Sequence, residues 1–272
     1  IFSGFACIAI AIMTFFGGIF LGQESGFGSL QSYLLFIIAV IALGLFIMVE
    51  RKRKSPLIKF AIFKNKIFTL SLLSAVLIFA SNFFVNVVIP FYLQDARKLS
   101  ASYAGLLMMV FPLLMVVGAP LSGYLTDKIG PGILTFGGLL LLCCTSLMYM
   151  FLDMNSPIWY YVIATAIMGL GNALFQSPNN TMVMSSVEKQ DLGVAGSMNS
   201  FARNLGMVIG IALSTTILYR GMSEAYGERV TTYLANRPDI FIVGMRETFF
   251  VAFLLCVAAF ILTILRFRKT TK

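Results

Sequence analysis

Amide side chains recur along one face of the apolar stretch 158–185, where Asn172, Gln176, Asn179 and Asn180 follow helical spacing. Pro178 lies among them and leaves a backbone carbonyl without its helical partner, which bends a helix. Amides on an apolar helix either bond to neighbouring helices or offer hydrogen bonds to a solute in a cavity. Packing accounts readily for one such amide but hardly for four. We therefore predict that this face lines a cavity.

A second polar face is predicted in the stretch 67–93. Asn82 and Asn86 stand four residues apart there, on the same side of a helix, and Phe83 lies beside them. Amides next to an aromatic surface could bind an amphipathic molecule. The alternative is that the amides only form hydrogen bonds between helices, as polar residues in membrane helices often do.

A third face contains a charge. Asn199, Arg203, Gly206 and Gly210 share one side of the stretch 193–219. An arginine at membrane depth costs about 2.5–3.5 kcal/mol on insertion scales, so Arg203 should face protein or water and have a partner, such as Asn199 or Asn204. The two glycines form a G-x-x-x-G that allows another helix to approach closely. The alternative to a gating role is a structural arginine bonded to carbonyls.

The string GYLTDKIGPG (123–132) separates two long apolar runs and predicts a tight turn at the membrane edge. Gly123 and Gly130 allow close helix approach and unusual backbone angles. Asp127 could cap the helix that follows, and Lys128 adds a charge of opposite sign. The alternative is a turn whose charges are simply solvated.

The composition of the sequence indicates the class of protein in which these residues lie. Of the 272 residues, 59% are hydrophobic and only 11% are charged, whereas a soluble domain has about a quarter of its residues charged. Apolar runs of about 18 residues or more indicate transmembrane helices rather than barrel strands. The sequence has no histidine, and it offers no nucleophile–base pair, metal-ligand spacing or P-loop. We expect no enzyme, no catalytic residue, no bound metal and no cofactor.

Charge and hydropathy together predict an all-α polytopic protein. The net charge of +9 does not indicate nucleic acid, because the basic residues lie at the ends of apolar runs. We predict three regions: two accessory helices in 1–49, a basic cytoplasmic linker in 50–66 and six helices in 67–272. The eight expected spans are 4–22, 31–49, 67–93, 101–125, 132–152, 158–185, 193–219 and 248–267. A long polar loop is expected at 220–247.

Lys and Arg set the predicted orientation. The connections on one side, including the linker 50–66 and the tail 266–272, hold 13 basic residues, and those on the other side hold 6. The positive-inside rule places the first set, with the C-terminus, in the cytoplasm. The sequence begins inside an apolar run and without Met or a signal peptide, so we expect it to be the C-terminal part of a longer protein.

The turn and its flanks resemble a known family. Gly123, Asp127, Lys128 and Gly130 resemble the Gly-x-x-x-Asp-(Arg/Lys)-x-Gly signature that follows the second helix of each half in major facilitator transporters. Pro131 and the next glycine stand where members often have basic residues. The string PFYLQDARKLSASYAGLLMMVFPLLMVVGAPLSGYLTDKIG resembles the C-terminal half of the fourteen-helix drug:proton antiporters, and PLIKFAIFKN resembles the segment before it.

The resemblance implies a fold and an activity. It implies two accessory helices followed by the six-helix C-terminal half, a cavity lined by the first and fourth helices of that half, and a charged latch at the turn. The implied partners are a small amphipathic substrate, protons, the lipid bilayer and a missing N-terminal six-helix half. The implied location is a bacterial plasma membrane.

The same resemblance leaves the coupling group unplaced. None of the eleven acidic residues falls in the middle of an expected span, so the proton-coupling carboxylate is expected in the absent half. The alternatives are a dedicated metabolite exporter or uniporter of the same fold, and a non-transporting membrane scaffold or truncated partner.

Overall fold

The structure is a computed structural model that describes residues 2–25, 29–51, 60–234 and 237–267. All regular elements of these residues are helices. Three short 3₁₀ or π-helical segments lie between the α-helices of the described residues. In order they are α1 (Phe2–Ser25), α2 (Leu30–Arg51), η1 (Phe60–Lys64), α3 (Lys66–Pro90), η2 (Phe91–Ala96), α4 (Ala101–Met108), α5 (Val110–Ile129), α6 (Pro131–Met150), α7 (Ile158–Ser185), η3 (Lys189–Asp191), α8 (Leu192–Tyr226) and α9 (Pro238–Phe267).

The chain forms two compact units, Ile1–Lys64 and Asn65–Lys272. In the first unit, α1 and α2 pack against each other. A Cβ added at Gly18 would lie 3.2 Å from the Phe36 ring, and the rings of Phe15 and Phe36 meet edge to face with centroids 5.9 Å apart. Residues 52–59 of the predicted basic linker 50–66 lie outside the described residues.

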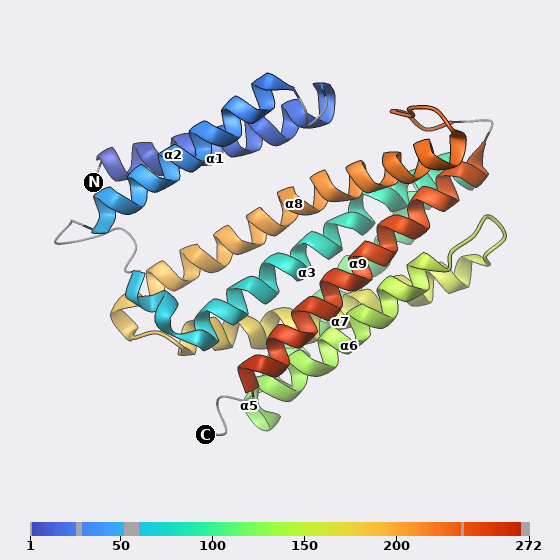
Figure 1. Ribbon diagram of the computed structural model, residues 1–272. Coiled ribbons are helices and arrows are strands. Elements are labelled where there is room, and N and C mark those ends of the chain that lie inside the picture. Colours follow the sequence, from blue (N-terminus) through green and yellow to red (C-terminus); the bar gives the residue numbers. More distant parts are fainter. Residues whose placement is uncertain (1, 26–28, 52–59, 235–236, 268–272) are drawn as a thin grey trace. The chain divides into compact units, whose positions relative to one another are not determined.

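The second unit contains the six-helix arrangement. Helix α3 packs on α8 and α9, α7 packs on α5 and α6, and α6 also packs on α9; α3 and α7 touch along the middle (Figure 1). Lipid is as apolar as a leucine side chain, so these helices associate through close packing and interhelical hydrogen bonds. A Cβ added at Gly138 of α6 would lie 2.7 Å from the Phe175 backbone nitrogen of α7, which shows how closely these two backbones approach.

Local sequence explains where the helices begin and end. The Asn65 side-chain oxygen accepts the Ile67 N–H at 2.9 Å and so caps the start of α3. Gly130 has a φ of +85°, which a residue with a side chain rarely adopts, and Pro131 then opens α6 at the position where its missing N–H costs nothing. Gly227, with a φ of +87°, ends α8.

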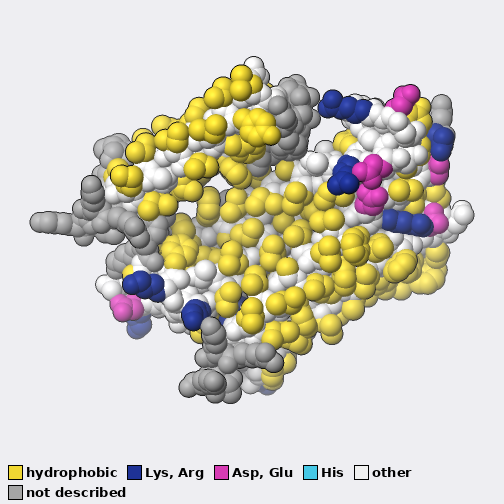
Figure 2. Space-filling model, in the orientation of Figure 1, with side chains coloured by type: hydrophobic (Ala, Val, Ile, Leu, Met, Phe, Trp, Pro, Cys, Tyr) yellow, Lys and Arg dark blue, Asp and Glu magenta, His cyan; other side chains and the backbone are white. Residues whose placement is uncertain are grey.

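The span prediction is confirmed in kind and corrected in detail. Seven stretches of the described residues are long and apolar enough to cross a bilayer: Leu30–Val49, Lys66–Ala96, Ala101–Ile129, Pro131–Met150, Ile158–Ser185, Lys189–Tyr226 and Pro238–Phe267. The remaining predicted span falls in α1, whose apolar stretch Ala6–Gly22 is shorter. In the second unit, charged side chains gather near the helix ends and apolar side chains cover the surface between them (Figure 2).

The predicted loop 220–247 is wrong at both ends. Helix α8 continues to Tyr226 and α9 already begins at Pro238. Arg246 and Glu247 lie in the predicted loop. The structure places both as exposed side chains on α9, whereas Phe241 and Met245 on the same helix are buried. Charged side chains can lie on the exposed side of a helix near its end. The two charges therefore did not mark where α9 begins.

Candidate functional site

The predicted amides of α3 and α7 meet at the centre of the second unit. Asn82 Nδ2 donates to Asn172 Oδ1 at 2.5 Å, and Asn172 Nδ2 donates to Asn82 Oδ1 at 3.1 Å. Both side chains are buried, with exposed fractions of 7% and 3%. The pair therefore satisfies its own hydrogen bonds and joins the two helices, which is the alternative that the sequence left open for Asn82.

A small internal cavity lies next to this amide pair. Its volume of about 10 Å³ is roughly the space that one water molecule needs, so it cannot hold a drug-sized solute. Its lining comes from α3, α6, α7 and α9 and consists of Ser81, Asn82, Val85, Leu142, Thr145, Ser146, Tyr149, Met168, Phe249, Ala252 and Cys256. This cavity is part of the packing between helices.

Other predicted cavity residues lie nearer the surface of the unit. Asn86 is exposed and donates to the Asn82 carbonyl at 3.2 Å, while Phe83 is partly exposed on the same helix. Gln176 is also partly exposed and lies one helical turn from Asn172. The structure thus separates the predicted set into amides that are buried in pairs and side chains that a solute could reach.

The amides nearer the Gly130 end of the unit are tied to other helices. Asn179 is 2% exposed. Its Nδ2 donates to the Ser71 carbonyl at 3.2 Å, and its Oδ1 accepts from Arg266 Nη1 at 3.2 Å. Arg266 Nη1 also donates to Ser71 Oγ at 2.8 Å. One buried guanidinium therefore connects α3, α7 and α9.

The sequence did not reveal the role of Arg266. We counted it in the basic tail 266–272, at the end of the predicted span 248–267, and the structure places it in the last turn of α9 with only 3% of it exposed. Its position next to further basic residues hid this role, since a cluster of Lys and Arg at a helix end is typical of a cytoplasmic anchor. Ser71 and Asn179, which bind it, lie far away in the sequence.

The predicted gating face of α8 contacts α3 and α7. Asn199 Nδ2 donates to Asn180 Oδ1 of α7 at 2.7 Å. A Cβ added at Gly206 would lie 2.5 Å from the Val76 carbonyl oxygen of α3, and Gly210 lies equally close to the α3 backbone. The predicted close approach of a helix to the G-x-x-x-G is therefore confirmed.

Arg203 differs from the expectation. Its side chain is exposed, and its guanidinium carbon lies 5.2 Å from the centre of the Phe79 ring of α3. Neither expected partner forms a hydrogen bond with Arg203 in the part of the chain that the structure describes: Asn199 donates to Asn180, and Asn204 is exposed. A guanidinium next to an aromatic ring gains a cation–π attraction, so Phe79 is the partner that the structure provides.

The four residues of the GYLTDKIGPG signature surround the α5–α6 turn. Gly123 lies on α5 with the Ser177 hydroxyl of α7 3.7 Å from the position of an added Cβ. Asp127 and Lys128 are exposed, and the Lys128 ammonium lies 4.5 Å from the centre of the Tyr124 ring. Asp127 does not cap α6 as predicted, because α5 continues past it to Ile129 and Gly130 occupies the cap position without a side-chain bond.

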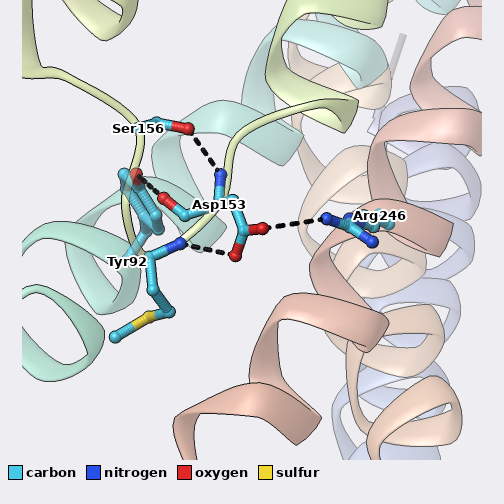
Figure 3. Close-up of polar contacts among 5 residues, drawn as sticks. Tyr92, Asp153, Ser156 and Arg246 are labelled. Carbon is cyan, nitrogen blue, oxygen red and sulfur yellow. Dashed lines mark hydrogen bonds and ion pairs between the residues drawn. The ribbon is translucent and has the colours of Figure 1, made fainter.

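A polar network at the opposite end of the unit was missed entirely (Figure 3). The Tyr92 hydroxyl donates to the Asp153 carbonyl at 2.8 Å, and the Asp153 N–H donates to Ser156 Oγ at 2.8 Å. Arg246 of α9 forms an ion pair with the Asp153 carboxylate at 3.4 Å. Arg97 donates to the Tyr92 hydroxyl and to the Ser156 carbonyl. The network joins η2, the α6–α7 loop and α9.

Two further features bear on chemistry at this end. Outside the spans, burial raises the pKa of the Tyr233 hydroxyl, and the nearby carboxylate of Asp95 adds to the rise.

Among the residues the structure describes, no group of three or more His, Cys, Asp or Glu side chains is arranged to hold a metal ion. The arrangement offers hydrogen bonds, aromatic rings and exposed guanidinium groups, that of Arg203 among them, to a solute.

Comparison with known proteins agrees with this architecture. The chain is 29% identical over 236 residues to the riboflavin transporter RibZ of Clostridioides difficile, which covers 87% of the chain and 50% of that protein. It is 29% identical over 219 residues to the multidrug transporter protein MdtP of Bacillus subtilis, covering 80% of the chain and 40% of that protein. It is 24% identical over 221 residues to the multidrug resistance protein Stp of Mycobacterium tuberculosis, covering 81% and 41%.

The chain spans about half the length of the relatives it matches. These relatives are bacterial, and RibZ and MdtP are named as transporters, in agreement with the prediction of a non-enzymatic membrane protein. The family description "Major Facilitator Superfamily" matches residues 1–211 and again residues 72–272, so the two matches together cover the whole sequence. With its membrane-spanning helices and its six-helix unit, the chain belongs to the Major Facilitator Superfamily.

Proposed function

We propose that the chain is part of a secondary active transporter that exports amphipathic drugs or toxic compounds in exchange for protons by alternating access. The observation that carries the proposal is the accessible set of polar and aromatic side chains on α3 and α7, namely Phe83, Asn86 and Gln176. Two of the relatives described above are named as multidrug proteins, which supports this substrate class.

In this proposal the buried and accessible amides have different tasks. Asn86, Gln176 and Phe83 contact the substrate, because adaptable apolar surface with few fixed charges suits loosely specific binding. Asn82, Asn172, Asn179 and Asn180 would hold together the helices that form the wall of the proposed substrate cavity. Their hydrogen bonds to one another and to α8 and α9 would then change when the cavity opens or closes.

The latch and gating residues complete the proposed cycle. Asp127 and Lys128, between Gly123 and Gly130, would bind charged groups of another helix in one state and release them in the other. Helix α8 would move along its glycine contacts with α3. We place the proton-coupling carboxylate in an N-terminal six-helix half, whose presence would account for the length of the relatives.

We also propose a setting for the whole protein. The excess of Lys and Arg on one side of the spans supports a cytoplasmic C-terminus, and the bacterial relatives support a bacterial plasma membrane. An antibody against the C-terminal tail should detect a protein about 20 kDa larger than the 29.9 kDa of this chain, which corresponds to roughly six more helices. A band at the size of this chain would contradict the proposed N-terminal half and favour a scaffold or a truncated partner.

A second candidate is export of one metabolite. It is favoured by the relative named as a riboflavin transporter. The two candidates differ in selectivity, because a multidrug site accepts unrelated molecules that compete with each other. A site for one metabolite rejects most of them.

The test uses the full-length protein in inside-out membrane vesicles. No substrate gradient is imposed across the vesicle membrane. A proton gradient should then drive accumulation of a xanthene dye, and a protonophore should abolish that accumulation. Asn86→Ala and Gln176→Ala should lower accumulation severalfold, whereas Gln190→Ala, an exposed amide in η3, should not. Accumulation that persists without a proton gradient would contradict antiport. Competition by riboflavin but by no unrelated dye would select the metabolite exporter.

A further inference from the structure

We propose that Arg203, Phe79, Phe83 and Asn86 form a binding strip for the anionic group and adjoining aromatic ring of a substrate. This inference rests on the proposed transport function and narrows its substrate class to amphipathic aromatic acids.

The strip follows from helical spacing and one contact between α3 and α8. Phe79, Phe83 and Asn86 stand at i, i+4 and i+7 on α3 and therefore share one face. The Arg203 guanidinium of α8 lies 5.2 Å from the centre of the Phe79 ring. Gly206, one turn further along α8, lies against the α3 backbone at Val76, which fixes the two helices next to each other at this level.

The depth of Arg203 makes it a costly residue to keep without a function. It lies eleven residues, about 16 Å, from the start of α8, whose 35 residues extend over about 52 Å. With the helix centred on a hydrocarbon layer about 30 Å thick, Arg203 lies inside that layer. Its side chain is nevertheless exposed on this unit. No ion pair joins Arg203 to an acidic side chain in the described part of the chain. An exposed charge at this depth needs water or an anion rather than lipid.

The contact with Phe79 leaves the anion-binding part of the side chain available. A guanidinium that packs on an aromatic ring still has N–H groups along its edge, and these match the two oxygens of a carboxylate or a similar planar anion. Phe83 continues the aromatic surface along α3, and Asn86 adds an amide beyond it. The order of charge, rings and amide fits a molecule with an acidic group at one end of an aromatic body.

A competing occupant is a carboxylate side chain from the proposed N-terminal half. Such a carboxylate would neutralise Arg203 in every ligand state, and loss of Arg203 would then impair the protein with any substrate. A substrate anion instead makes the effect of Arg203 depend on ligand charge. The two occupants are therefore separated by comparing ligands that differ only in charge.

The experiment measures binding and transport by the full-length protein with two ligands. One is a xanthene dye with a free carboxylate, and the other is its ethyl ester. Arg203→Gln should weaken binding of the acid at least about tenfold, as expected for loss of a charge-assisted hydrogen bond in a desolvated site. It should change binding of the ester less than about twofold. Arg203→Lys should retain part of the acid binding, because the charge remains but the paired geometry is lost.

Two controls keep the result specific. Arg220→Gln removes an exposed arginine from the same helix that is paired with Glu224 at 2.7 Å, and it should alter neither ligand. Gel filtration should confirm that each variant is folded, and if Arg203→Gln aggregates, Arg203→Lys decides the comparison. Phe79→Leu should weaken both ligands, since both stack on the ring.

Each outcome has one meaning. Equal losses for acid and ester, or no loss for either, would overturn the proposal, and equal losses would favour the carboxylate of the other half. Export of the ester without an Arg203-dependent preference for the acid would overturn this inference and leave the transport function standing. Arg203-dependent binding of the acid without export of either dye would overturn the transport function instead.

Discussion

The α5–α6 turn at Gly130 and the α6–α7 turn at Asp153 lie at opposite ends of α6 and are built differently. At Gly130, Asp127 and Lys128 project from the last turns of α5 as exposed side chains, and the Lys128 ammonium lies next to Tyr124 of its own helix. At Asp153, hydrogen bonds from the loop reach η2 and an ion pair reaches α9. The first turn carries a recognisable sequence signature and the second carries none.

The difference shows that a turn can carry a sequence signature without being held by contacts to other helices of its unit, and can be held by such contacts without carrying a signature. The Asp153 turn is held inside its own six-helix unit, because Tyr92, Arg97 and Ser156 satisfy its backbone groups and Arg246 pairs with its carboxylate. The Gly130 turn exposes both of its charges, which suits residues whose proposed partners belong to another part of the transporter. Beneath that turn, the tie is made in the interior, where Arg266 binds Ser71 and Asn179.

The interior tie should give the largest change in stability. Asn179→Ala removes an acceptor from the buried Arg266 and the donor to the Ser71 carbonyl. Hydrogen bonds to charged groups are worth about 1.5–3 kcal/mol, so we expect the free energy of unfolding to fall by about 2–3 kcal/mol. Thermal unfolding in detergent measures the change. Asn180→Ala, its neighbour with a bond to Asn199, should lose less, and an equal loss would show that Arg266 is not the reason.

The Tyr92 hydroxyl should rank second. Tyr92→Phe keeps the buried ring and removes only the hydroxyl that binds the Asp153 carbonyl and accepts from Arg97. A single such bond contributes about 1 kcal/mol. We expect a drop of about that size in the unfolding free energy, measured in the same assay. Tyr160→Phe, which removes a bond to the Met148 carbonyl at the same end, provides the comparison. No drop in the Tyr92 variant would mean that the Asp153 turn is not held by its hydroxyl.

The exposed ion pair at the Asp153 end should matter little for stability. The side chains of Arg246 and Asp153 are 47% and 53% exposed, and exposed pairs contribute about 0–1 kcal/mol. Arg246→Gln should therefore shift the unfolding temperature by at most a few degrees, and high salt should reduce that shift because it screens the pair. A large, salt-independent loss would show that Arg246 has a buried role which its exposure does not indicate.

The signature itself should give the smallest change in stability. Asp127→Asn removes no hydrogen bond or ion pair found among the described residues, so the unfolding free energy should stay within about 0.5 kcal/mol. Dye export by the full-length protein should nevertheless slow if Asp127 acts as a latch. A marked loss of stability would show that Asp127 has a partner within this part of the chain. Unchanged export would remove the latch from the mechanism.

Much of the fold could be read from the sequence because its causes are local. Apolar length fixed the spans, Gly130 and Pro131 marked a turn, and the spacing of Gly206 and Gly210 predicted a helix contact that the structure confirms. The boundary of the last span failed because hydropathy counts charges without knowing which side of the helix they occupy. Arg246 and Glu247 face outward on α9, so the helix continues past them.

The candidate site was harder to predict, since its residues are paired across long sequence separations. The sequence placed Asn82 and Asn172 on polar helix faces, but only packing brought these side chains, 90 residues apart, into mutual hydrogen bonds. No local pattern indicated that Arg266 would bind Ser71, 195 residues away. The Arg203 contact with Phe79 likewise depends on which side of α8 faces α3, and the sequence does not specify that orientation.

The sequence alone determined that this protein crosses a membrane as helices, which polar residues those helices carry and which turn resembles a transporter latch. These properties depend on transfer of side chains into lipid and on helical period, and both are local. Tertiary structure decided which polar groups satisfy one another and which stay accessible to a solute. That outcome depends on how each helix is rotated and how closely its neighbours pack, because a buried amide or guanidinium takes whichever partner the adjoining helix places within hydrogen-bond distance.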